Sequence, residues 1–123
     1  MADSDRRQRG LQKFNEVYGG TLPAPPAGTL DFFDLMLEQL FGEVWTRPAL
    51  SQRDRRLLVM GAIVALGERE AFAIQVRSAL QNGELTAEQC REVVIQLTQY
   101  AGYPRVSTLV SAVETIIAEV GAS

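Results

Sequence analysis

A polar amide at Gln75 interrupts the apolar face of a helical stretch, AFAIQVRSALQNG, which covers residues 71–83. Its neighbours at helical spacing are all small or apolar, namely Ala71, Phe72, Ser78 and Ala79. A buried amide needs hydrogen-bond partners, which a ligand or the protein's own backbone carbonyls can supply. Glutamine donates and accepts hydrogen bonds but has no proton that titrates near neutral pH. Gln75 is therefore a candidate for holding a substrate or polarising its carbonyl group.

Arg47 and Arg55 lie in a stretch that also holds Glu43 and Trp45. A guanidinium group binds a carboxylate through two parallel hydrogen bonds, so both arginines are candidates for anchoring an acidic or oxygen-rich substrate. Equally, they can form surface ion pairs with Glu43 or Asp54. Burial beside Trp45 would raise the pKa of Glu43 and make it a general acid or base, but an ion pair with Arg47 is the simpler role.

Two aromatic residues complete the candidates that the residue types suggest. Trp45 is the sole tryptophan, and Tyr103 follows Gly102 in a predicted turn. Each combines a large apolar body with a polar group, so each could contact a substrate in a pocket. Packing in the core or at an interface is the more common role of such residues, and it stays open for both.

Metal and thiol chemistry are disfavoured by composition. The chain has no histidine, and Cys90 is its single cysteine. An ordinary zinc site needs several nitrogen or sulfur ligands, and a redox pair needs two cysteines. The acidic residues also lack the close alternation of a calcium-binding loop. We therefore expect no metal and no cofactor, and we expect Cys90 to be a buried, inert thiol.

Charge and hydropathy bound the class of partner. Twelve basic and fifteen acidic residues give a net charge of −3, so the basic clusters RRQR and RDRR do not make a basic domain. Nucleic-acid binding is therefore not expected. The longest apolar run, LLVMGAIVALG, is too short to span a bilayer, and the N-terminal residues are too polar for a secretory signal. These patterns predict a cytoplasmic protein without a membrane segment.

Helical periodicity runs through the chain, and no segment alternates with period two. The glycines and prolines of residues 19–28 predict an irregular connector, and Thr86 with Gln89 forms a capping-box pattern. The 123 residues suit a single all-α domain, 1–123, with an N-terminal helix and connector in 1–29 and core helices in 30–123. The expected helices span residues 5–18, 30–41, 51–66, 68–82, 86–100 and 104–120.

Four stretches, in order along the chain, together resemble the carboxymuconolactone decarboxylase family. They are RGLQKFNEVYGG (9–20), FGEVWTRPALSQRDRRLL (41–58), VRSALQNG (76–83) and YAGYP (100–104). The resemblance implies the helical-bundle fold that this family shares with the alkylhydroperoxidases, and assembly into a homo-oligomer: a dimer, trimer or hexamer. It also implies decarboxylation of γ-carboxymuconolactone to an enol-lactone, with Arg47 and Arg55 at positions where the family has arginine.

The same comparison singles out two glutamines. Relatives usually have histidine at the position of Gln75, and often at that of Gln96, just before the YAGYP turn. The alkylhydroperoxidases have their two cysteines where this chain has Glu68 and Ala71, so thiol peroxidase chemistry is not expected. Glutamine cannot deliver a proton as histidine does, and a lost acid or base typically costs about 100- to 10,000-fold in rate. Alternatively, both amides are structural.

Three functions follow from these observations. The chain is expected to be a small-molecule enzyme, either the family's decarboxylase or a divergent, for example biosynthetic, relative. The divergent enzyme would use Gln75 and Gln96 to orient a carboxylated lactone or similar substrate for decarboxylation, isomerisation or cyclisation. In these schemes Gln75 and Glu43 are catalytic, and the residues expected to bind substrate are Arg47, Arg55, Gln96, Trp45 and Tyr103. The alternative is a non-catalytic, oligomeric ligand-binding or scaffold member.

Overall fold

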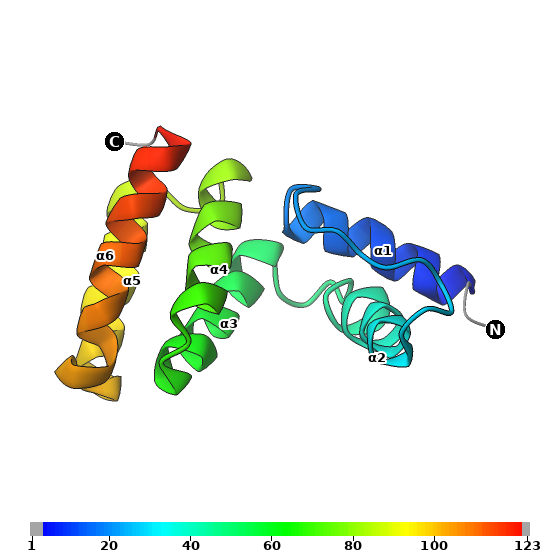
Figure 1. The fold of residues 1–123 in the computed structure, drawn as a ribbon, viewed down its shortest axis with the longest axis horizontal. Helices are drawn as coiled ribbons and strands as arrows, with labels where there is room; N and C mark the ends of the chain where they lie inside the picture. Colours follow the sequence, from blue (N-terminus) through cyan, green and yellow to red (C-terminus); the bar gives the residue numbers. More distant parts are fainter. Residues whose placement is uncertain (1–3, 122–123) are drawn as a thin grey trace. The chain divides into compact units, whose positions relative to one another are not determined.

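The structure is a computed structural model that describes residues 4–121, and every regular element within that range is a helix (Figure 1). The predicted all-α class is therefore confirmed. The elements are α1 (Asp5–Val17), α2 (Asp31–Leu35), the π-helix η1 (Met36–Val44), α3 (Gln52–Leu66), α4 (Arg69–Gln81), α5 (Ala87–Ala101) and α6 (Tyr103–Val120).

The chain forms two compact units, one ending at Gln52 and the other beginning at Arg53. In the first unit, α1 packs along η1, and α2 leads directly into η1. A cluster of aromatic rings forms its core, with Phe14, Phe41 and Trp45 all buried. The rings of Phe41 and Trp45 are stacked with centroids 5.9 Å apart, and Phe14 meets Phe41 edge to face. Trp45 is thus a core residue of this unit.

The second predicted helix differs from expectation, because it changes into a π-helix at Met36 and continues to Val44. The backbone N–H of Trp45 accordingly donates to the carbonyl of Leu40, five residues earlier, at 2.9 Å. Leu37, Phe41 and Trp45 are buried at intervals of four residues, which suits the wider π turn. Residues 36–41 also keep an apolar period close to 3.6, so the sequence pattern could not distinguish the two helix types.

A buried ion pair holds the irregular connector against the first unit. Arg7 Nε donates to Asp34 Oδ1 at 2.7 Å, and both side chains are almost fully buried. Arg7 Nη2 also donates to the carbonyl of Pro25, and Asp34 Oδ2 accepts from the backbone N–H of Gly28. The pair therefore satisfies backbone groups of a segment that has no regular hydrogen bonding of its own.

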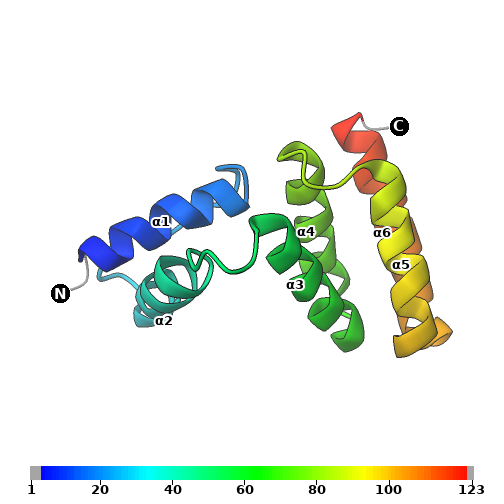
Figure 2. The same cartoon turned by 180° about the vertical axis from the view of Figure 1, so that it is seen from behind.

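The second unit is a bundle in which α6 packs against both α4 and α5 (Figures 1 and 2). Its core includes Met60 and Val64 of α3, Phe72 and Val76 of α4, and Cys90, with Val94, Val106, Leu109 and Val113 from α5 and α6. The predicted capping box is confirmed, since the Thr86 and Gln89 side chains each accept from the other's backbone N–H. No helix among residues 4–121 is long and apolar enough to cross a membrane.

Replacing Gly10 with alanine should destabilise the first unit. A Cβ atom there would lie 1.6 Å from the Leu37 carbonyl oxygen, so α1 and η1 would have to separate. We expect a loss of about 1–3 kcal/mol in the free energy of unfolding, measured by chemical denaturation. Gly61→Ala is the control, because its Cβ would meet Leu97 only at 4.0 Å. Equal destabilisation by both variants would contradict the close approach.

Alkaline pH should destabilise the second unit through Cys90. Burial raises the pKa of its thiol from 9.0 to about 11, partly offset by the nearby positive charge of Arg91. Above pH 9 the unfolded chain releases this proton while the folded chain retains it, so stability falls as the pH rises from 9 towards 11. The loss at pH 10.5 should be about 2 kcal/mol. Cys90→Ala should remove this part of the pH dependence in parallel denaturation curves; an unchanged slope would refute it.

Candidate functional site

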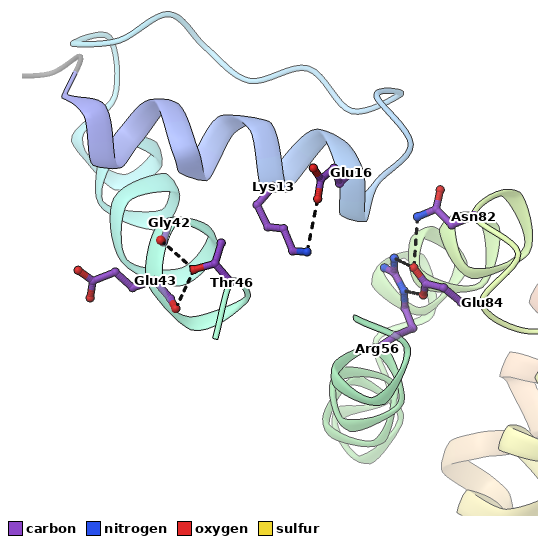
Figure 3. A network of polar contacts seen from close by, with 8 residues as sticks. All are labelled: Lys13, Glu16, Gly42, Glu43, Thr46, Arg56, Asn82 and Glu84. Carbon is purple, nitrogen blue, oxygen red and sulfur yellow. Dashed lines mark hydrogen bonds and ion pairs between the residues drawn. The ribbon is translucent and has the colours of Figure 1, made fainter. Parts of the chain in front are cut away.

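The guanidinium group of Arg56 lies fully buried in the second unit. Its Nε donates to Glu84 Oε1 at 2.8 Å and its Nη2 to Glu84 Oε2 at 3.2 Å, which is a two-point arginine–carboxylate contact (Figure 3). Its Nη1 donates to Gln75 Oε1 at 2.7 Å. A buried charge is tolerated only when it is paired and hydrogen-bonded, and Arg56 meets both conditions.

Three elements position this buried cluster, which we call the Arg56 cluster (Arg56, Gln75 and Glu84). Arg56 lies on the buried face of α3, four residues before Met60 and eight before Val64. Gln75 lies on the buried face of α4. Glu84 follows the end of α4, where its backbone N–H donates to the carbonyl of Ala79 at 2.9 Å.

Gln75 is buried as predicted, and its partner is now identified as an arginine that sequence reasoning passed over. The amide oxygen faces a permanent positive charge, so it acts in this cluster as a hydrogen-bond acceptor. Such a contact fixes both the amide and the guanidinium in one orientation, since each has few other arrangements available in the interior. Gln75 therefore positions Arg56, whatever else it contacts.

A pocket of about 420 Å³ lies between α3 and α5 in the same unit, and we call it the α3/α5 pocket. Most of its lining residues are aliphatic, and its polar groups are one arginine, one glutamate and two amides. The lining residues are Arg53, Leu57, Leu85, Gln89, Glu92, Val93, Ile95, Gln96 and Leu97. An apolar cavity with a few polar groups is the usual form of a small-molecule site.

Arg53 connects the α3/α5 pocket with the Arg56 cluster. Its Nε donates to the backbone carbonyl of Glu84 at 3.0 Å. Glu84 therefore contacts both arginines, Arg56 through its carboxylate and Arg53 through its backbone. Arg53 thus supplies a positive charge at the pocket, whereas the charge of Arg56 is neutralised by Glu84 in the interior.

The predicted site residues divide between the two units. Gln96 lines the α3/α5 pocket, whereas Gln75 belongs to the Arg56 cluster. Arg55 lies on α3, half-buried. Tyr103 is exposed at the start of α6, where its hydroxyl accepts from Gln99 Nε2 at 3.2 Å. These residues all belong to the second unit. Gln75 and Gln96 therefore lie in the same unit, but Gln75 is not among the residues that line the α3/α5 pocket.

The other predicted residues, Glu43, Trp45 and Arg47, belong to the first unit. Glu43 is exposed and forms an ion pair with Arg6 Nε at 2.8 Å, an arginine that the sequence analysis had not considered as its partner. Its backbone carbonyl accepts from the Thr46 hydroxyl, as does that of Gly42 (Figure 3). Arg47 is exposed, and its backbone N–H donates to the Val44 carbonyl.

Sequence reasoning missed Arg53, Arg56 and Glu84. A signal for Arg56 was present, because it shares helical spacing with the apolar residues Met60 and Val64 and so had to lie on the buried face. Glu84 carried no such signal, since it lies in the turn after α4 and its role depends on tertiary packing. In the described range 4–121, no group of three or more histidine, cysteine, aspartate or glutamate residues is arranged to hold a metal ion.

Removing the charge of Glu84 should strongly destabilise the second unit. Glu84→Gln would leave the buried Arg56 charge without its counterion, so we expect a loss of about 3–5 kcal/mol in the free energy of unfolding. Glu119→Gln is the matched control, because Glu119 pairs with Arg77 at the surface and its loss should cost less than about 1 kcal/mol. Urea denaturation measures both, and a loss at Glu84 no larger than at Glu119 would contradict the buried pairing.

Comparison with known proteins finds relatives of this chain by sequence. The chain is 27% identical to 4-carboxymuconolactone decarboxylase of Acinetobacter baylyi over 126 residues, covering 98% of this chain and 93% of that protein. It is 34% identical to nitrosuccinic acid decarboxylase of Metarhizium robertsii over 71 residues, covering 58% of this chain and 49% of that protein. An uncharacterised 15.0 kDa protein of Paracoccus denitrificans is 30% identical over 86 residues, covering 68% of this chain and 63% of that protein.

The matching region contains the helices that build the site. Residues 31–115 match the carboxymuconolactone decarboxylase family, and this range includes the Arg56 cluster and the whole α3/α5 pocket. The resemblance of four short motifs is thereby extended to a continuous match over more than half of the chain. The chain belongs to the carboxymuconolactone decarboxylase family.

Proposed function

We propose that this protein is a decarboxylase-like enzyme that acts on a small carboxylated substrate bound in the α3/α5 pocket. Family membership and two decarboxylase relatives support decarboxylase-like chemistry. The observation that carries the proposal is the placement of Arg53 and Gln96 on one pocket, with Glu84 linking Arg53 to the buried Arg56 cluster. That arrangement offers a carboxylate anchor beside a hydrogen-bonding amide.

The substrates named for the two relatives share one chemical feature. In each, the carbon that can lose carbon dioxide is connected to an electron acceptor, an unsaturated lactone in one and a nitro group in the other. When the carbon–carbon bond breaks, its electron pair moves onto the oxygen atoms of that acceptor, and water can then supply the proton to carbon. Fixed N–H donors stabilise such developing negative charge without a titrating residue.

The side chains of the pocket suit a reaction in which the protein stabilises the developing charge and water supplies the proton. Arg53, Gln89 and Gln96 all line the pocket. In this scheme Arg53 binds a carboxylate, and the amide N–H groups of Gln89 and Gln96 donate to the oxygen atoms on which charge develops. Gln75 holds Arg56 in place, and Arg56 holds Glu84, so these three are positioning residues for the pocket wall. A histidine at residue 75 is not required for this scheme, because proton delivery falls to solvent.

The remaining predicted residues stay predictions. Arg55 and Tyr103 of the second unit, and Glu43, Trp45 and Arg47 of the first, are not among the residues that line the α3/α5 pocket. Single alanine variants of Arg55, Tyr103, Glu43 and Arg47 distinguish a role in the site from a purely structural role. A lower kcat/KM with unchanged stability would place a residue in the site. Trp45 is buried in the core of the first unit, so Trp45→Phe is the informative variant.

Incubation of the purified protein with 4-carboxymuconolactone and with nitrosuccinate should release carbon dioxide from at least one of them. Arg53→Gln should lower kcat/KM about 10- to 100-fold, because a bidentate arginine contact to the substrate is lost. Arg77→Gln is the matched control, since Arg77 pairs with Glu119 at the surface and should leave kcat/KM unchanged. Release no faster than in buffer, for both substrates, would refute the proposal.

Two observations favour a second candidate, a non-catalytic oligomeric ligand-binding member. The chain has no histidine, and several large apolar side chains of the first unit are exposed, namely Leu30, Phe32, Leu35, Leu40 and Val44. Such a surface suits contact with a second copy of the chain. If the protein is instead a divergent isomerase or cyclase, its substrate would bind in the same α3/α5 pocket. Binding of the two substrates without any change in them would favour the ligand-binding function.

A further inference from the structure

The α3/α5 pocket is electrically asymmetric. Among the described residues that line it, Arg53 and Glu92 carry the charges, and they come from different helices, α3 and α5. Its other polar groups are the amides of Gln89 and Gln96, and the rest of the lining is aliphatic. A ligand inside the pocket therefore meets a positive group from α3 and a negative group from α5.

Arg53 is oriented so that part of its guanidinium group stays available. Its Nε donates to the Glu84 backbone carbonyl at 3.0 Å, which fixes the plane of the group. Its Nη1 approaches Asp54 only at 4.0 Å, and both side chains are about half exposed. The edge formed by the two terminal nitrogens is thus the part that can receive a carboxylate through parallel hydrogen bonds.

Glu92 differs from two glutamates of the second unit that form ion pairs, Glu84 and Glu114. Glu84 is paired with Arg56, and Glu114 is paired with Arg91, which donates to it and lowers the pKa of its carboxyl group. Within residues 4–121, Glu92 makes no ion pair. Its carboxylate is therefore not held in an ion pair at the pocket.

The spacing of the polar groups on α5 aligns them with one another. Gln89, Glu92 and Gln96 are three and four residues apart, so they lie on one face of α5, and all three line the pocket. The Oε1 atom of Gln89 is fixed by the Thr86 backbone N–H at 2.9 Å, so the N–H group is the end of this amide that a ligand can use. A ligand lying along α5 has an amide donor on each side of the Glu92 carboxylate.

We infer that this asymmetry orients a dicarboxylate substrate, with the carboxylate that is retained on Arg53 and the carboxylate that leaves beside Glu92. The inference rests on the proposed decarboxylation. In that step the bond between carbon and the departing carboxylate breaks, its electron pair moves to the adjacent acceptor, carbon dioxide leaves uncharged, and water protonates the carbon. Repulsion by Glu92 is present in the bound substrate and is relieved as the departing group loses its charge.

This arrangement lowers the energy barrier to decarboxylation, because the repulsion between Glu92 and the departing carboxylate is stronger in the bound substrate than in the transition state. The opposite orientation would place the departing group on Arg53, which would stabilise the charge that must be lost. Glu92 and Arg53 are both exposed, so salt screens their effect on a bound ligand. We therefore expect a modest contribution, about threefold to tenfold at low ionic strength, which falls as salt is added.

A binding experiment on the full-length protein tests the charge asymmetry without turnover. Succinate and 3-nitropropanoate have nearly the same shape, but a neutral nitro group in the second replaces one carboxylate of the first. By calorimetric titration at low salt, the protein should bind 3-nitropropanoate about threefold to tenfold more tightly than succinate. Glu92→Gln should remove this preference, and Arg53→Gln should weaken both ligands. Glu88→Gln, one turn earlier on α5 and outside the pocket, should change neither affinity.

Kinetics then separate this inference from the proposed function. With a dicarboxylate substrate that is turned over, Glu92→Gln should lower both KM and kcat, because it stabilises the bound substrate more than the transition state. Carbon dioxide release with KM and kcat unaffected by Glu92→Gln would overturn the orientation while leaving the decarboxylase function intact. No release, together with a charge preference that Glu92→Gln removes, would overturn the function but not the asymmetry of the pocket. Equal binding of both probes by the unmodified protein would overturn the inference.

Discussion

The burial of one guanidinium charge governs the second unit. Arg56 cannot remain in an apolar interior unless its donors are satisfied, and the two groups that satisfy them come from separate parts of the chain. Gln75 must therefore face α3 from α4, and the turn after α4 must bring Glu84 back towards α3. The same turn places the Glu84 carbonyl against Arg53, so the wall of the α3/α5 pocket depends on a charge that lies behind it.

An amide suits the position of Gln75, beside a buried arginine, where the family resemblance implies a histidine in relatives. An imidazole facing a buried arginine would be held neutral by the adjacent positive charge, whereas an amide accepts from the guanidinium with no cost in protonation. Gln75 and Arg56 are thus compatible partners, and the amide oxygen is used as an acceptor rather than as a source of protons. Family membership accordingly describes the scaffold and its chemistry in general, while the side chains of this chain specify how charge is handled in it.

Sequence patterns predicted the parts of the structure that depend on local rules. The capping box at Thr86, the ends of α1 and of α3 to α6 and the all-α class follow from spacing and residue type, and each is present. The π-helix was missed because its apolar spacing also suits an α-helix. Gln75 and Gln96 were singled out from the sequence, yet Arg53 and Glu84 were not, because their contacts join segments more than 25 residues apart. Arg56 could have been found from its position on an apolar helix face.

The buried pair of Arg7 and Asp34 divides the connector of the first unit into two stretches that should differ in how well they tolerate changes of length. The carbonyl of Pro25 and the N–H of Gly28 are both tied to this pair, so the chain between Pro25 and Asp34 has a fixed length to span. The residues from Gly20 to Ala24 carry no such tie to the pair. Insertions and deletions among relatives should therefore occur in residues 20–24 and be absent from residues 25–34. A change of loop length is tolerated where the backbone makes no hydrogen bond to a buried group.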